Sequence, residues 1–161
     1  MNKRKTIIIV IIIWIIAASI IGIAALTSKS KTSISAIGFA TTMSSKGYEI
    51  VDANKQFEQY EYVTNAYIAR NNSSSYQIEF YELSDDTIAK SFFIQNKTNF
   101  EKQKENTLAE TNVNGKNYSK YTLSTGNKYK VLSRIDNTVI YLDVDNSYKE
   151  EVKNILGELG Y

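Results

Sequence analysis

The side chains best suited to acid–base chemistry in this sequence are carboxylates, because the chain has neither histidine nor cysteine. Without imidazole or thiolate, the commonest catalytic bases and nucleophiles and the usual zinc and haem ligands are missing. Two carboxylates could still hydrolyse a glycosidic bond if they faced each other across a cleft. The candidates are scattered, and no spacing brings two of them together: Asp52, Glu79, Asp85, Asp86 and Asp143. A serine–lysine pair is equally unspecified, since both residues are abundant. The sequence therefore assigns no catalytic residue and no cofactor.

One acidic segment, residues 143–146, has the alternating carboxylates expected of a calcium-binding loop. Counted from Asp143, the sixth position is Tyr148, where an EF-hand loop needs glycine, and the twelfth is Asn154, where it needs glutamate. We therefore expect this segment to end a strand and to help cap the last helix, and we assign no metal site.

Tyrosine is the residue type whose abundance hints at binding, with 12 in the chain. Its ring combines a large apolar face with a polar hydroxyl, which suits contacts with proteins and glycans alike. Tyrosine also favours strands and half-buried sheet positions, and this packing interpretation is the stronger of the two. The tyrosines that we select as a candidate partner-binding set are Tyr62, Tyr81, Tyr121 and Tyr129.

The net charge of +2 does not indicate a nucleic-acid-binding domain. Lys3, Arg4 and Lys5 contribute +3, which leaves −1 for the remaining residues. A domain that binds nucleic acid would carry a basic face on its folded part. We therefore exclude nucleic acid as a partner.

Residues 6–26 form an uncharged run of 21 residues rich in isoleucine. A helix of this length spans about 32 Å, which matches the core of a bilayer, and no polar face interrupts the run. The run therefore predicts a transmembrane helix, with the lipid bilayer as its partner. The basic tip at residues 1–5 places the N-terminus in the cytoplasm and the rest of the chain on the outer side of the cell membrane.

A cleaved signal peptide is the main alternative for this segment, because its basic start is similar. Its apolar region would be shorter, about 7 to 15 residues, and no good small-residue cleavage site follows the run. We therefore expect a single-pass signal anchor, a tether at residues 27–33 and an extracytoplasmic domain at residues 34–161. The asparagine, lysine, isoleucine and tyrosine bias without proline is typical of a low-GC Gram-positive bacterium.

The residues after the tether alternate between strand and helix patterns, which predicts an α+β domain. Turn residues separate short β-rich runs, and these runs are residues 48–51, 62–70, 75–83, 110–113, 116–123, 128–135 and 138–144. Helices are expected after Ser33, over about residues 85–104 and after Ser147. We predict one domain in which a mostly antiparallel sheet of about five to six strands packs on three helices.

Each expected helix has a cap and an apolar side. The first begins at Ser33, ends near Gly47 and has an apolar side at Ile34, Ile37, Ala40 and Met43. The second is capped by residues 84–86 and carries three phenylalanines on its apolar stripe. The third begins with a capping box at Ser147 and Glu150.

These expectations favour a non-catalytic binding or assembly module with an envelope protein or glycan as partner. We expect the helices to cover one face of the sheet and the tyrosines to lie on the other. The alternative is a small cell-wall hydrolase that uses a carboxylate pair without histidine or cysteine.

Overall fold

The computed structural model describes residues 29–73 and 75–161. Helices and strands follow one another in the order α2 (Ala36–Ser45), β1 (Glu49–Asp52), η1 (Asn54–Phe57), β2 (Val63–Arg70), β3 (Gln77–Leu83), α3 (Asp86–Lys102), β4 (Thr107–Asn114), β5 (Tyr118–Thr125), β6 (Lys128–Ile135), β7 (Thr138–Asp145), η2 (Asn146–Tyr148) and α4 (Lys149–Glu158). The α+β class and the three helices are confirmed for these residues.

The sheet has seven antiparallel strands in the order β1-β2-β3-β7-β6-β5-β4, so the prediction of about five to six strands was too low. The seven runs expected from the sequence, residues 48–51 and 110–113 among them, correspond to the seven strands, so the error lay in the count of strands and not in the runs. No residue of β1 or β4, the two edge strands, is buried. β7, the last strand of the chain, lies at the centre, between β3 and β6.

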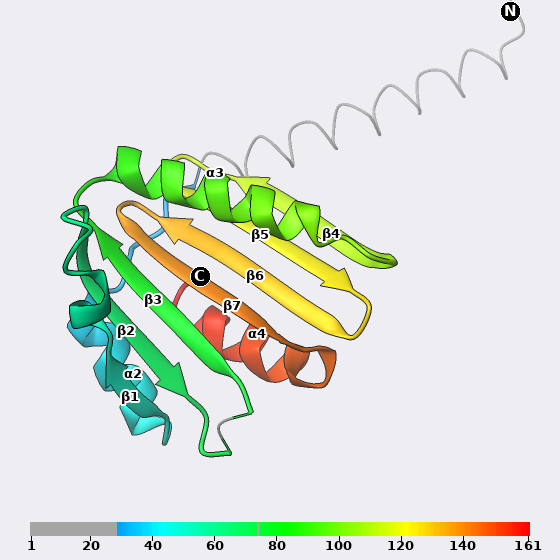
Figure 1. Cartoon of the computed structure of the whole chain (residues 1–161), viewed down its shortest axis with the longest axis horizontal. Coiled ribbons are helices and arrows are strands. Elements are labelled where there is room, and N and C mark those ends of the chain that lie inside the picture. Colours follow the sequence, from blue (N-terminus) through cyan, green and yellow to red (C-terminus); the bar gives the residue numbers. More distant parts are fainter. Residues whose placement is uncertain (1–28, 74) are drawn as a thin grey trace, which may run out of the picture.

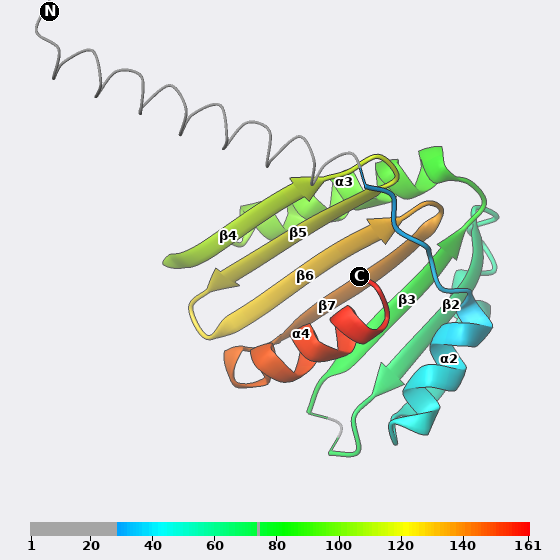
Figure 2. The same ribbon diagram turned by 180° about the vertical axis from the view of Figure 1, so that it is seen from behind.

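Helices cover both faces of the sheet, as Figures 1 and 2 show from opposite sides. α3 lies on one face, and α2 and α4 lie on the other. The expectation that one face is open to solvent was therefore wrong. The strands bury side chains on both faces, because the helices α2 and α4 share one face and leave α3 to cover the other.

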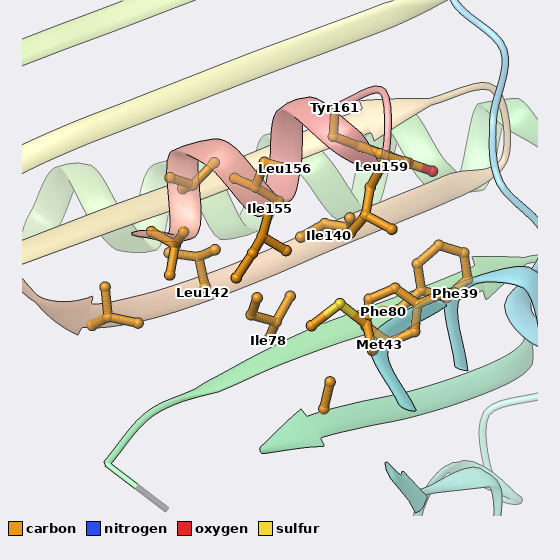
Figure 3. Close-up of a cluster of buried hydrophobic side chains, with 14 of the residues drawn as sticks. Phe39, Met43, Ile78, Phe80, Ile140, Leu142, Ile155, Leu156, Leu159 and Tyr161 are labelled. Carbon is orange, nitrogen blue, oxygen red and sulfur yellow. The ribbon is translucent and has the colours of Figure 1, made fainter. Parts of the chain in front are cut away.

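The core beneath α2 and α4 is built from alternating residues of the strands (Figure 3). Ile78 and Phe80 of β3 meet the helices there, and the ring of Phe80 stacks on Phe39 of α2 with centroids 4.8 Å apart. Burying two such rings and their aliphatic neighbours supplies a large share of the apolar burial that drives folding.

The first helix is shifted from its predicted register. Ser35, not Ser33, caps α2 by accepting a hydrogen bond from the backbone N–H of Gly38 at 3.1 Å. The buried side of α2 consists of Ala36, Phe39 and Met43, while Ile37 is 74% exposed. Of the four predicted core positions in this helix, only Met43 is buried.

The third helix follows its predicted apolar side but not its predicted cap. Val152, Ile155 and Leu156 are buried against the sheet. The helix begins after the short 3-10 helix η2, and no side chain caps it, so the capping box at Ser147 was wrong. Because η2 already continues into α4, Ser147 is inside that turn and not before it.

Helix α3 has the cap and stripe that the sequence predicted. The carboxylate of Asp85 accepts a hydrogen bond from the backbone N–H of Ile88 at 2.8 Å. Ala89, Phe93 and Phe100 are buried in the second core, between α3 and the sheet. α3 therefore covers this face of the sheet.

The predicted membrane helix at residues 6–26 lies outside the described residues. Within residues 29–73 and 75–161, none of the helices has the length and apolar character needed to cross a bilayer. Lys31 of the predicted tether is held by the domain. Its backbone N–H donates to Asn117 at 2.9 Å, its carbonyl accepts from the Asn117 amide at 2.8 Å, and its ammonium donates to the Gly160 carbonyl at 2.8 Å.

Candidate binding surfaces

The four selected tyrosines occupy different environments. Tyr62 is 41% exposed, whereas Tyr81, Tyr121 and Tyr129 are exposed by 8%, 0% and 5%. The three buried rings belong to the two cores, because helices cover the faces on which they lie. Their rings are packed inside the protein in this structure, which favours the packing interpretation for them.

Tyr62 belongs to a chain of touching rings that we call the aromatic surface: Phe57, Tyr60, Tyr62, Tyr81 and Phe92. Tyr81 is the buried member of this chain. The centroid of its ring lies 5.4 Å from that of Phe57 and 5.2 Å from that of Phe92. Phe57 contacts Tyr60 at 6.3 Å, and Tyr60 contacts Tyr62 at 5.7 Å. Tyr60 and Tyr62, at 40% and 41% exposure, form the end of the chain that faces solvent.

Backbone hydrogen bonds fix the segment that carries these two rings. Tyr60 donates to the carbonyl of Phe57 at 2.8 Å, and Val63 donates to the carbonyl of Tyr60 at 2.9 Å. The backbone N–H of Ser84, at the end of β3, donates to the carbonyl of Tyr62 at 2.9 Å. The backbone that carries the two rings is therefore ordered before any ligand arrives.

A shallow groove of about 200 Å³ lies beside Tyr62, on one flank of α3. Its walls are Tyr62, Ile88 and Phe92, and its polar groups are the hydroxyl of Ser91 and the amide of Gln95. The volume is below the roughly 300 to 1,000 Å³ of pockets that hold drug-sized ligands.

A larger groove of about 350 Å³, which we call the basic groove, lies on the other flank of α3, above β4, β5 and β6. Its lining combines three cations, polar side chains and the apolar edge of α3: Lys90, Phe93, Ile94, Lys97, Thr98, Asn112, Asn114, Ser119 and Arg134. Asn114, Ser119 and Arg134 are successive cross-strand partners, so they form one polar row beneath the helix.

Arg134 is the most buried cation of the basic groove, at 2% exposure. Its Nη1 donates to the carbonyl of Asp136 at 2.9 Å, while its buried Nε has no hydrogen-bond partner within the described part of the chain. Burial lowers the pKa of this guanidinium, and the nearby carboxylates of Asp86 and Asp136 oppose the shift.

Each of the five candidate carboxylates has its own polar partner, and two of them, Glu79 and Asp143, lie on the paired strands β3 and β7 near Tyr141, whose pKa is raised first by burial and then by these two charges. Asp85 caps α3, Asp52 accepts from the backbone of Asn54, and Asp86 pairs with Lys90. The hydrogen bond from Lys90 lowers the pKa of Asp86.

The remaining two carboxylates are held beneath α3. Glu79 accepts hydrogen bonds from the hydroxyl of Tyr81 at 2.6 Å and the amide of Gln77 at 2.8 Å. Asp143 pairs with Lys130, which also donates to Gln103. No group of three or more potential metal-ligating side chains occurs in residues 29–73 and 75–161.

No protein-family model, curated protein or solved structure matches this chain. The candidate surfaces therefore rest on their own geometry.

Sequence reasoning missed Tyr60 and the whole basic groove. Tyr60 lies between the expected runs at residues 48–51 and 62–70, although the two tyrosines that flank Glu61 were a visible signal. Arg134 also had a signal, because it interrupts the apolar run of β6 at a position buried by the helix. Its grouping with Asn114 and Ser119 depends on strand register, which the sequence does not specify.

Proposed function

We propose that this protein is a membrane-anchored, extracytoplasmic binding module of a bacterial cell envelope that holds a saccharide on its aromatic surface. The observation that carries this proposal is the pair of half-exposed rings of Tyr60 and Tyr62 beside the small groove. The anchor is the predicted helix at residues 6–26, and the outer location follows from the basic tip before it.

The aromatic surface supports a saccharide through its combination of groups. A sugar ring has an apolar face of C–H groups that packs on an aromatic ring, and hydroxyls at its rim that need hydrogen-bond partners. Tyr60 and Tyr62 supply ring faces, and Ser91 and Gln95 supply a hydroxyl and an amide at the groove. The fixed backbone of this segment limits the ordering cost of binding.

A catalytic role has no such support in the described residues. A glycosidase needs two carboxyl groups across one cleft, with the acid held protonated by a raised pKa. The pKa values of Asp86 and Glu110 are both lowered, the first by a hydrogen bond from Lys90 and the second by one from Lys104. We therefore propose a module without catalytic activity.

The test is co-sedimentation of the full chain, in neutral detergent, with purified peptidoglycan. We expect Tyr60→Ala and Tyr62→Ala each to weaken binding about tenfold, because interfaces concentrate energy in a few aromatic residues. Ile37→Ala is the matched control, since Ile37 is exposed on α2, on the other side of the sheet. It should bind like the wild type.

Thermal unfolding of each variant separates lost binding from lost structure. The two tyrosine variants should keep the wild-type Tm within a few degrees, because both rings are about half exposed. Absence of binding by the wild-type chain, or unchanged binding by both tyrosine variants, would reject the saccharide proposal.

A further inference from the structure

The basic groove is separate from the aromatic surface, because α3 lies between them and contributes different residues to each. Lys90, Lys97 and Arg134 bring three positive charges to its lining, and none of its lining residues carries a carboxylate. Asn112, Asn114 and Ser119 add amide and hydroxyl groups to the lining. The lining therefore places hydrogen-bond donors next to cations.

Two lysines of the lining already pair with carboxylates, and a bound anion would have to compete with these carboxylates. Lys90 pairs with Asp86 at 2.8 Å, and Lys97 pairs with Glu101 at 2.6 Å. Both pairs are partly exposed, so each is weak and can reorganise. Arg134 differs, because its guanidinium is buried with an unpartnered Nε and cannot be satisfied by water in the same way.

The groove ends where the chain enters the domain. Asn114 and Ser119 flank the β4–β5 turn, and Asn117 of that turn holds Lys31 by two backbone hydrogen bonds. Only residues 27–30 then remain between Lys31 and the predicted anchor, a reach of about 14 Å at most. With the anchor of the proposed function in place, the turn at this end of the groove lies near the lipid surface, while Lys31 itself packs over Tyr118 on the other face of the sheet.

We propose that the basic groove binds a phosphate group, and that the phosphate belongs to the headgroup of a membrane phospholipid. A guanidinium matches the oxygens of phosphate with parallel N–H donors, and two lysines add charge to a group that carries at least one negative charge. Cationic residues next to an anchor also gain from the negative surface of the membrane. The lipid would thus fix the orientation of the domain on the bilayer.

The experiment measures binding to the full chain in neutral detergent with two probes, inorganic phosphate and dihexanoyl-phosphatidylglycerol. Lys90→Gln and Lys97→Gln should each weaken binding about threefold to tenfold, and Arg134→Gln about tenfold or more. Lys153→Gln is the matched control. Lys153 is an exposed lysine on α4 that also pairs with an acid within its own helix, Glu150.

The two probes distinguish the sources of phosphate. Tighter binding of the lipid assigns the site to a headgroup, and tighter binding of the free ion assigns it to a soluble phosphate. No binding of either probe, or equal losses in Lys90→Gln and Lys153→Gln, overturns the proposal. The lysine variants keep the test decisive if Arg134→Gln unfolds. Failure here would leave saccharide binding at Tyr60 and Tyr62 unchanged, so the two proposals fail separately.

Discussion

At Tyr121 the ring lies wholly inside the protein, under the ammonium of Lys97 at 5.2 Å from its centroid. Its hydroxyl donates to the carboxylate of Glu110 at 2.9 Å. Burial, followed by the hydrogen bond to Glu110, raises the pKa of Tyr121 to about 12. The folded protein therefore holds this phenol in its neutral form.

The first prediction concerns stability at high pH. A raised folded pKa means that the stabilisation is complete below the ordinary value of 10.0 and is lost as the pH rises towards about 12. Tyr121→Phe should cost about 1 kcal/mol at neutral pH, because it removes one hydrogen bond. It should then lose less stability than the wild type between pH 10 and 12. Denaturant titrations at several pH values measure the free energy of unfolding of both proteins. An equal loss of stability in the wild type and in Tyr121→Phe between pH 10 and 12 would contradict the prediction.

The alternation of residues along β3 was predictable, but its meaning was not. The alternation of apolar and polar residues predicts Ile78 and Phe80 on one face of the strand and Tyr81 on the other, and they lie so. The error was to treat the second face as open. Whether a tyrosine on a strand meets solvent or a helix depends on where helices pack, and periodicity alone carries no such information.

At the scale of the element, α2 shows why helix starts are difficult to place. Thr32, Ser33 and Ser35 can all accept a capping hydrogen bond, and they lie within four residues. The structure selects Ser35, because that start turns Ala36, Phe39 and Met43 towards the sheet. Tertiary burial, and not local capping, decides the register here.

The second prediction separates the two serines. Ser35→Ala should lower the free energy of unfolding by about 1 kcal/mol, because the N–H of Gly38 loses its partner. Ser33→Ala, the matched control, should change it by less than about half of that. Urea denaturation of both variants decides, and a larger loss for Ser33→Ala would show that the helix begins earlier.

At the scale of the whole molecule, both proposed binding surfaces, the aromatic surface and the basic groove, lie beside α3, one on each flank. The sequence predicted this helix well, because its cap, length and apolar stripe are local signals. Neither flank could be predicted, since the aromatic surface and the basic groove each combine residues distant in sequence.

The third prediction tests the topology, which rests on the uncharged run at residues 6–26 and the basic tip before it. Protease added to intact protoplasts should degrade residues 33–161 and spare the short tip, because the proposed orientation places the domain outside the membrane. A cytoplasmic protein in the same cells is the control. Survival of the domain until lysis would show that the orientation is reversed.

The order of strands has a consequence for how the chain can fold as it is made. β1, β2 and β3 can pair among themselves early, and so can β4, β5 and β6, but only β7 joins these two groups. β7 follows the other six strands along the chain, and α4, which covers it, follows β7. Until those residues are available, β3 and β6 have edges that their central neighbour has not covered. During synthesis the two groups of strands therefore stay unjoined until β7 and α4 have been made, and in that period the domain is most open to aggregation or to capture by a chaperone.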